Sequence, residues 1–308
     1  MKISLFYKNV TVLDYAYLDD HKGVVGDALK VHVEFIGKTD EEGVVYDFSY
    51  AKKKVKEIID RDCDHRLVVP TGLINTIDRD KTVFTYTYGL NDEKIDYQCP
   101  RQGICELPFH HVNKVTIASY LEEVILAEMP KTVSAVKITL EDESFGKVSD
   151  QGIEKEKPTF HYTHGLKEHY GNCQRLFHGH KNTVDVYING TESWEWENYL
   201  ASDLFKNNIH FCKWENVLNK EEVFKYSAGQ IPKGVVRELP QVEIGYTSAQ
   251  GEFKAKLPGK EVFFMESEST VENLSMLFAN IVKEKVGTEK NVTVRAYEGV
   301  AKGAITSL

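Results

Sequence analysis

The chain has 308 residues, of which 42% are apolar and 28% are charged, a balance typical of a globular protein with ordinary cores. Acidic side chains (47) outnumber basic ones (38), and the net charge of -9 argues against a nucleic-acid partner because phosphate backbones recruit basic surfaces. Five cysteines in so long a chain do not make a disulfide scaffold, and their odd number leaves at least one thiol unpaired.

The N-terminal segment, MKISLFYKNVTVLDYAYLDD, has a short apolar run, but acidic residues follow early and no small-residue cleavage site is present. No apolar run approaches the roughly 18 residues that a membrane span needs. Free thiols are typical of a reducing compartment. We therefore expect a cytoplasmic protein that is neither exported nor inserted in a membrane.

The first half of the chain predicts strands on both sides of a helix. Period-two alternation of apolar and polar residues predicts strands over residues 2–18 and 28–37. A helix is expected over about residues 50–60, with Asp47 or Ser49 as its cap. The elements expected next are strands across 81–107 with a turn at 89–92, a helix over 115–129 that Pro130 ends, and a strand over 135–141.

The second half predicts the same order of elements. Residues 146–158 are polar and contain Gly and Pro, so they are the best linker candidate. Beyond them, Gly190 occupies the place that Gly37 has in the first half. The elements expected here are strands near 159–164 and 182–190, a helix near 197–207, strands across 221–265 with a turn at 248–251, a helix over 271–285 and a last strand over 291–297.

This repetition predicts a tandem duplication of one α+β unit. The first unit is expected over residues 1–148 and the second over residues 149–308. The first strands of each half are antiparallel candidates, so each half is expected to form an antiparallel sheet with two helices packed on one face.

The stretch Phe160–Val186, FHYTHGLKEHYGNCQRLFHGHKNTVDV, holds the strongest chemical signal. His178 and His180 are two residues apart, so on a strand they lie on the same face. A hairpin that joins this strand to the one carrying His164 would bring three imidazoles together. Three protein ligands with a fourth position open are the usual arrangement of a catalytic zinc. Cys173, in the same window, would lie beside such a cation.

These residues resemble the zinc and nucleophile motif of the 6-pyruvoyltetrahydropterin synthase and 6-carboxytetrahydropterin synthase family. That family has the T-fold, an antiparallel sheet with two helices that oligomerises into a β-barrel. Gly43–Phe48 and Glu268–Leu274 look like the entries to the two helices of the family. The resemblance implies that Asp64-His65 is the proton-relay pair, and that Glu141 is the glutamate that anchors the pterin ring.

Neither half carries the whole set of residues. The first-half segment that matches the zinc motif, Asp20–Asp27, has no His-Gly-His and no cysteine. The second-half segment that matches Asp-His reads Lys213–Asn216, and Glu298 is only a weak substitute for the anchoring glutamate. The halves together make one set, which predicts a composite site. The first half supplies Asp64, His65 and Glu141, and the second half supplies Cys173 and the three histidines.

Each of these residues also has a plain structural interpretation. Histidines on strands can be solvent-facing or satisfied in a core, and Cys173 can be a small buried residue. His65 can interact with the dipole at the C-terminus of a helix. Glu141 can be a surface residue in the acidic run Glu141–Glu143.

The resemblance implies a zinc-dependent lyase that takes 7,8-dihydroneopterin triphosphate and eliminates triphosphate. We prefer 6-carboxytetrahydropterin synthase, which serves the queuosine pathway, and the alternatives are 6-pyruvoyltetrahydropterin synthase and a non-catalytic pterin- or purine-binding protein. A composite site further predicts a homo-oligomer. It would be either a barrel with an even number of T-fold units per ring or separate rings of like halves stacked face to face.

Overall fold

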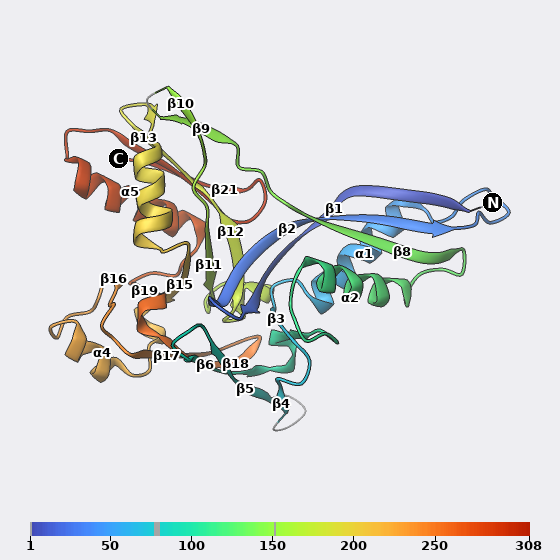
Figure 1. Cartoon of the computed structure of the whole chain (residues 1–308), viewed down its shortest axis with the longest axis horizontal. Coiled ribbons are helices and arrows are strands. Elements are labelled where there is room, and N and C mark those ends of the chain that lie inside the picture. The colour runs from blue at the N-terminus through green and yellow to red at the C-terminus, as the bar shows by residue number, and fades with distance from the viewer. Residues whose placement is uncertain (1, 77–80, 151) are drawn as a thin grey trace.

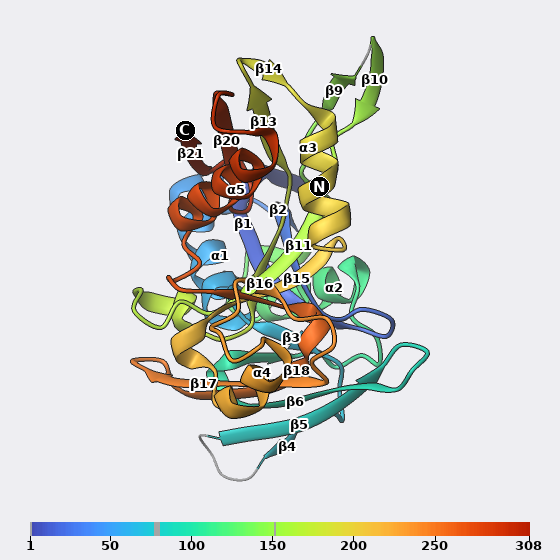
Figure 2. The same cartoon turned by 90° about the vertical axis from the view of Figure 1, so that its left-hand side faces the viewer.

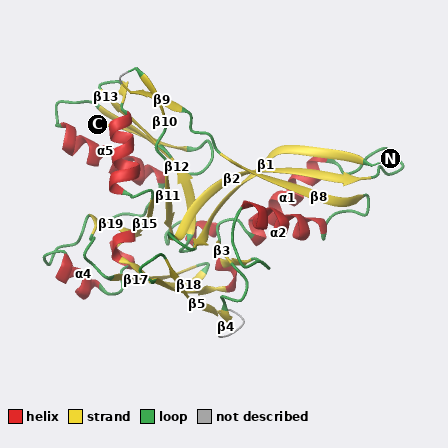
Figure 3. Ribbon diagram, viewed as in Figure 1, coloured by secondary structure: helices red, strands yellow, loops and turns green. Residues whose placement is uncertain are grey.

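The computed structural model describes residues 2–76, 81–150 and 152–308, and its helices and strands form several packed layers (Figure 3). Several sheets with separate helices confirm the α+β class. The expected antiparallel sheets were wrong in part, because each half also contains parallel strand pairs. The α-helices are α1 (Phe48–Asp62), α2 (Lys114–Leu126), α3 (Trp194–Asn198), α4 (Lys220–Tyr226) and α5 (Val271–Val286). Within these described ranges, no helix combines the length and the apolar character needed to cross a bilayer.

The first half forms a five-stranded sheet with the order β7-β3-β1-β2-β8. Its strands are β1 (Ile3–Asp19), β2 (Gly23–Gly37), β3 (Leu67–Val69), β7 (Ile104–Glu106) and β8 (Val133–Asp142). Helices α1 and α2 pack against this sheet, and the long strands β1, β2 and β8 extend as an arm toward the N-terminus (Figure 1). Asp47 caps α1 by accepting hydrogen bonds from the amides of Ser49 and Tyr50, as the sequence predicted for one of its two cap candidates.

The second half forms two sheets with the orders β12-β11-β15-β19-β16 and β14-β13-β20-β21. Only Thr183 separates β12 from β13, so one long stretch of chain serves both sheets. Helix α5 packs on β20 and β21, and α3 packs on β13. The strands are β11 (Phe160–His164), β12 (His178–Asn182), β13 (Val184–Ile188), β14 (Thr191–Glu192), β15 (Asn208–Lys213), β16 (Gly234–Val235), β19 (Val262–Met265), β20 (Val292–Tyr297) and β21 (Gly303–Ser307).

The same neighbour relations occur in both halves. Strand β3 runs parallel to β1 and β7 runs parallel to β3, as β15 does to β11 and β19 to β15. Strand β8 is antiparallel to β2, as β20 is to β13. This repeated order agrees with a tandem duplication, and the boundary between residues 148 and 149 stays a prediction.

A further sheet is shared between the halves and has the order β17-β18-β6-β5-β4. Its strands are β4 (Asn75–Thr76), β5 (Lys81–Tyr88), β6 (Glu93–Pro100), β17 (Gln241–Ser248) and β18 (Gly251–Pro258). Each half contributes one hairpin, and the hairpins join through β6 and β18, where Tyr97 is opposite Ala255. Figure 2 shows these strands side by side at the foot of the molecule. Backbone hydrogen bonds therefore connect the two halves.

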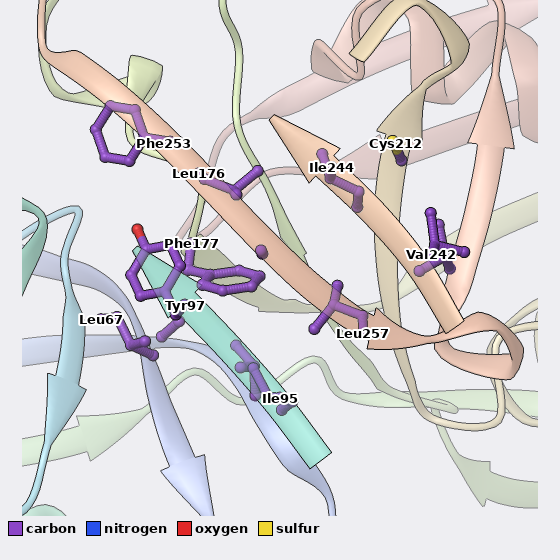
Figure 4. Packing of buried hydrophobic residues seen from close by; sticks show 14 of the residues in the cluster. Leu67, Ile95, Tyr97, Leu176, Phe177, Cys212, Val242, Ile244, Phe253 and Leu257 are labelled. Carbon is purple, nitrogen blue, oxygen red and sulfur yellow. The ribbon is translucent and has the colours of Figure 1, made fainter. Parts of the chain in front are cut away.

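The largest hydrophobic core lies on this shared sheet. It includes Tyr97 of β6 and Phe253 of β18, and both are almost completely buried. Leu176 and Phe177, directly before the His-Gly-His strand, extend into the same core beside Tyr97 (Figure 4). This packing anchors the loop that carries the candidate thiol.

Two glycines allow the long strands of the halves to cross closely. Gly26 of β2 and Gly179 of β12 are in backbone contact, and a Cβ at Gly26 would lie 2.6 Å from the amide nitrogen of His180. The ring of His161 reinforces the crossing, because its Nδ1–H donates to the carbonyl oxygen of Gly26 at 2.6 Å. Burial lowers the pKa of His161 to about 4 and keeps the ring neutral.

Several predicted elements differ from the structure. Residues 146–158 are not a plain linker, because they contain the hairpin of β9 (Lys147–Asp150) and β10 (Ile153–Glu156). The region 221–265 is not all strand, because α4 begins it with two glutamates that favour its N-terminus. The helix expected near 197–207 is α3 followed by a π-helical segment, Tyr199–Leu204, and β21 was not predicted.

Candidate active site

The three histidines of the motif meet on one face of the β11–β12 hairpin. His164 is opposite His178 in the antiparallel register, and His180 follows on the same face. Their ring centroids are 4.2 Å apart for His164 and His178 and 5.6 Å apart for His178 and His180. One ring nitrogen from each histidine lies within 4.8 Å of the others, and all three side chains are buried.

Two of the imidazoles are oriented by a hydrogen bond at Nδ1, and the third lies near a carboxylate. His164 donates to the carbonyl oxygen of Ser269 at 3.0 Å, and His178 donates to that of Arg175 at 3.1 Å. Nδ1 of His180 lies 3.4 Å from Oδ1 of Asp14. The Nε2 atoms of His164 and His178 are therefore left to bind a ligand. Nε2 of His164 and both ring nitrogens of His180 are buried without a hydrogen-bond partner.

This arrangement fits a divalent cation. Burial lowers the pKa of His164 and of His178 well below the usual value, and their neutral rings suit metal binding. Unpartnered buried nitrogens are costly unless a ligand uses them, and acceptors behind Nδ1 are typical of metal-binding histidines. Three imidazoles with an open fourth position match the donor set of a catalytic zinc.

The first half brings Asp64 and His65 to the same place. The pair follows α1, whose last turn accepts the amide of Asp64, and His65 has the left-handed φ of +53°. The His65 ring is 5.1 Å from that of His178, and a His65 nitrogen, the Cys173 sulfur and a His178 nitrogen lie within 4.8 Å of one another. The structure thus brings Asp64 and His65 of the first half beside Cys173 and His178 of the second half within one chain.

His65 is placed for proton transfer by Asp64, whose Oδ2 is 2.5 Å from Nδ1 of the ring. Burial alone would lower the pKa of His65, but the hydrogen bonds and charges of Asp64 and Cys173 outweigh burial and raise it to about 10. The ring is therefore an imidazolium at neutral pH in the metal-free protein. The free nitrogen of this ring faces Cys173.

Both halves hold the Asp64-His65 backbone. The amide of Asp14 donates to Oδ1 of Asp64 at 2.9 Å, and the amide of His65 donates to the carbonyl oxygen of Asp14 at 2.7 Å. From the second half, Arg175 Nη1 donates to the carbonyl oxygen of Asp64 at 3.3 Å. The relay pair is thus fixed by β1 and by the loop that carries Cys173.

Cys173 lies on a short 3-10 turn, Gly171–Gln174, between the two histidine strands. The turn is fixed because Tyr246 donates to the carbonyl oxygen of Gln174 at 2.9 Å. All five cysteines are free thiols, and Cys173 is half-buried whereas the other four are buried. Its partial exposure and its histidine neighbours distinguish it as the candidate reactive thiol.

A cavity of about 130 Å³ connects these groups. Besides the motif residues, its wall includes the N-terminal turn of α5, which begins after the cap residue Thr270, and the side chains of Glu298 and Lys302. The residues around it are His65, Leu166, His169, Cys173, His178, His180, Thr270, Val271, Glu272, Glu298 and Lys302. Two acids, Glu272 and Glu298, and the lysine Lys302 therefore line the cavity beside the motif residues.

Glu141 is the predicted site residue that does not reach the cavity. Its carboxylate is 3.3 Å from Nε2 of His32, on the face of β8 that lines a separate groove with Phe6 and Lys137. Its neighbour Asp142 points the other way and binds Lys181 of β12 at 3.1 Å. Of the carboxylates considered as the pterin anchor, the structure places Glu298 with the histidines.

Superposing the halves by their registers explains this difference. Gly26 of the first half corresponds to Gly179 of the second, and Gly37 corresponds to Gly190. The spacing is the same in both pairs, so it fixes which residues of the two halves are equivalent. Asp142 then corresponds to Glu298, because β8 and β20 have equivalent pairings to β2 and β13. Glu141 corresponds to Tyr297, on the opposite face.

The same registers show what replaces the missing motifs. Tyr17, Val25 and Asp27 of the first half stand where His164, His178 and His180 stand in the second. Residues 207–208, both asparagines, stand where Asp64-His65 stands, so the sequence-based match to residues 213–216 was wrong. Of the three first-half positions, only Asp27 has a side chain of a type that can bind a metal. The second half has no counterpart of the Asp64-His65 pair.

The sequence analysis missed Asp14 and Lys302. Asp14 was detectable as a lone acid inside an apolar strand, since a carboxylate in such a position is seldom buried without a partner. Nothing in the sequence around Lys302 predicts a role at the site, because its ion pair with Asp14, at 3.3 Å, joins residues far apart in the chain.

Comparison with known proteins identifies a family for the chain. A family model described as 6-pyruvoyl tetrahydropterin synthase matches residues 153–307, half of the chain. Among solved structures, a catalytic-residue mutant of Plasmodium vivax 6-pyruvoyltetrahydropterin synthase has 18% identity, covers 51% of this chain and 99% of its own, and gives a TM-score of 0.38. The Plasmodium falciparum enzyme has 17% identity, covers 45% and 90%, and gives a TM-score of 0.36. No curated protein matches the chain. By its match to the family model, the chain belongs to the 6-pyruvoyl tetrahydropterin synthase family.

Proposed function

We propose that the protein is a zinc-dependent pterin synthase that acts on 7,8-dihydroneopterin triphosphate and eliminates triphosphate. The observation that carries this proposal is the cavity where His65 of the first half, held by Asp64, meets Cys173, His178 and His180 of the second. His164 belongs to the same donor set as His178 and His180. A non-catalytic pterin-binding protein does not need a thiol, the Asp64-His65 pair and three metal-binding histidines close together, whereas the proposed enzyme does.

His164, His178 and His180 would hold the cation through their Nε2 atoms. A zinc ion bound there would polarise oxygens on the side chain of the substrate and lower the energy of negative charge that develops on them. The protein fixes the three rings through Ser269, Arg175 and Asp14, so little reorganisation is needed when the cation binds.

Proton transfer would belong to Cys173 and His65. An imidazolium beside a sulfur is the kind of partner that favours a thiolate, and a thiolate can take a proton from a side-chain carbon of the substrate. His65, whose pKa is raised to about 10, can supply a proton to an oxygen of the substrate, while Asp64 keeps its ring oriented. Departure of triphosphate then balances the loss of the carbon-bound proton.

We further propose that Glu298, rather than Glu141, anchors the pterin ring. A carboxylate can accept two hydrogen bonds from the amino group and the ring N–H of a pterin. Glu298 lines the cavity, whereas Glu141 binds His32 elsewhere. The volume of about 130 Å³ is smaller than a site of about 300 Å³ for a whole ligand, so the ring would extend beyond the cavity.

We keep 6-carboxytetrahydropterin synthase as the preferred product specificity. Its reaction loses acetaldehyde as well as triphosphate, whereas the 6-pyruvoyl reaction retains the side-chain carbons. The predicted homo-oligomer also belongs to this proposal. In the described residues, the sheet that contains β1 and β2 of the first half is separate from the sheets that contain β11, β12 and β13 of the second half. This separation favours stacked rings of like halves over an alternating barrel.

The test is to incubate the zinc-loaded protein with 7,8-dihydroneopterin triphosphate and to measure triphosphate and acetaldehyde. We expect both, and a loss of at least about 100-fold for Cys173→Ala, since acid–base groups contribute about 10²–10⁴-fold. Cys212→Ala, which removes a buried thiol outside the cavity, is the matched control. Absence of triphosphate release from the zinc-loaded wild type would reject the enzyme.

A further inference from the structure

One histidine belongs to two different sets of metal donors. His164, His178 and His180 form the first set, and His65, Cys173 and His178 form the second. In each set the donor atoms lie within 4.8 Å of one another. His178 is therefore shared between a purely nitrogen set and a set that contains sulfur.

The second set has the features of a built site. Asp64 engages Nδ1 of His65 at 2.5 Å, and His178 donates its Nδ1–H to Arg175, so each ring offers Nε2. A carboxylate or carbonyl oxygen behind each ring is the usual support of a metal-binding histidine. Cys173 completes the three donors, and its half-buried position leaves an entry path for an ion.

We propose that His65, Cys173 and His178 form an alternative site for a thiophilic divalent cation such as Cd²⁺, distinct from the three-histidine site. Thiolate ligands favour softer ions, so the second set prefers cadmium more strongly than the first does.

The two sites exclude each other. Nδ1 of His178 is held by Arg175, so only Nε2 can bind an ion, and one nitrogen serves one cation at a time. Occupation of the sulfur site also removes Cys173 and His65 from proton transfer. The site itself stands on the donor geometry alone, and only this inhibitory consequence rests on the proposed function.

The experiment titrates metal-free protein with Cd²⁺ and records the ultraviolet thiolate-to-cadmium absorption together with bound cadmium. His164→Ala removes only the nitrogen set, and His65→Ala removes only the sulfur set. We expect His164→Ala to develop the thiolate band and to saturate at one ion per chain. We expect Cys173→Ala to show no band, and the double variant His164→Ala/His65→Ala to bind at least about tenfold more weakly than His164→Ala.

Two results would overturn the proposal. One is the absence of the thiolate band in His164→Ala, checked with His180→Ala so that a folding defect in one variant cannot decide the result. The other is simultaneous occupation of the two sets in the wild type, seen as two bound cadmium ions of which His164→Ala loses one and Cys173→Ala loses the other, because the shared nitrogen of His178 forbids it. Neither result depends on pterin turnover, so the site can fail while the proposed enzyme stands.

Discussion

Oδ1 of Asp14, on the first long strand of the chain, lies 3.4 Å from Nδ1 of His180, on the His-Gly-His strand of the other half. Asp14 is 4% exposed, and its pKa is about 2: burial would raise it, but His180 and Lys302 outweigh burial. Its backbone also bonds to both residues of the relay pair. Asp14 thus couples the metal-ligand set to the relay pair.

Asp14→Asn should weaken zinc binding by about 10–100-fold, the usual cost of losing a carboxylate behind a metal-binding histidine. Competition with a chelator measures this affinity without turnover. Asp27→Asn is the matched control, because Asp27 is a buried acid at the first-half position that corresponds to His180. Equal affinities of wild type and Asp14→Asn would show that Asp14 only fills space.

The two candidate anchors can be separated kinetically. Glu298→Gln should raise KM at least about tenfold, since hydrogen bonds to a charged group contribute about 1.5–3 kcal/mol. Glu141→Gln should leave KM unchanged, because Glu141 binds His32 outside the cavity. The opposite pattern in steady-state kinetics would return the anchoring role to Glu141.

The glycine crossing should tolerate no side chain. Gly179→Ala would place a Cβ 2.8 Å from the carbonyl oxygen of Tyr162 and closer still to Gly26, so we expect a loss of about 3 kcal/mol or more in the free energy of unfolding. Gly146→Ala, at a φ of +78° but in open space, should lose only about 1 kcal/mol. Denaturant unfolding measures both, and similar losses would mean that the crossing can relax.

Acid should loosen the same crossing through His161. Its pKa is lowered to about 4 in the folded protein, so the unfolded chain binds the proton first as the pH falls below about 6.5. Stability is therefore complete above pH 6.5, and roughly 3 kcal/mol is lost between pH 6.5 and 4.

His161→Gln keeps a donor for the carbonyl of Gly26 but cannot titrate, so its stability should fall less over this range. His111→Gln, at a side chain that is 77% exposed, should behave like the wild type. Unfolding curves at a series of pH values decide the matter. Parallel curves for wild type and His161→Gln would assign the acid sensitivity to other groups.

The sequence was informative where the chemistry is local. The spacing of His178 and His180 on a strand predicts a shared face, and the hairpin with His164 then needs only ordinary antiparallel pairing. Asp64-His65 was assigned only through the resemblance to the family, at its place after a predicted helix. That these two groups meet was inferred because the first half lacks the His-Gly-His motif and the second half lacks the Asp-His pair.

The choice between Glu141 and Glu298 shows what a sequence leaves open. Adjacent strand residues face opposite sides, and in the equivalent strand pairings Glu298 corresponds to Asp142 rather than to Glu141. The contacts of Asp14 depend on the crossing of β2 and β12, which joins residues far apart in sequence through two glycines. Periodicity within one strand carries no information about such a crossing.

The most direct test of a cavity assembled inside each chain is complementation between two inactive variants. His65→Ala and Cys173→Ala chains would be mixed, unfolded and refolded together, and assayed for triphosphate release. Because Asp64, His65 and Cys173 meet within one chain, the mixture should be no more active than either variant alone. Recovery of a substantial fraction of wild-type activity would contradict the account, since it would place His65 of one chain beside Cys173 of another.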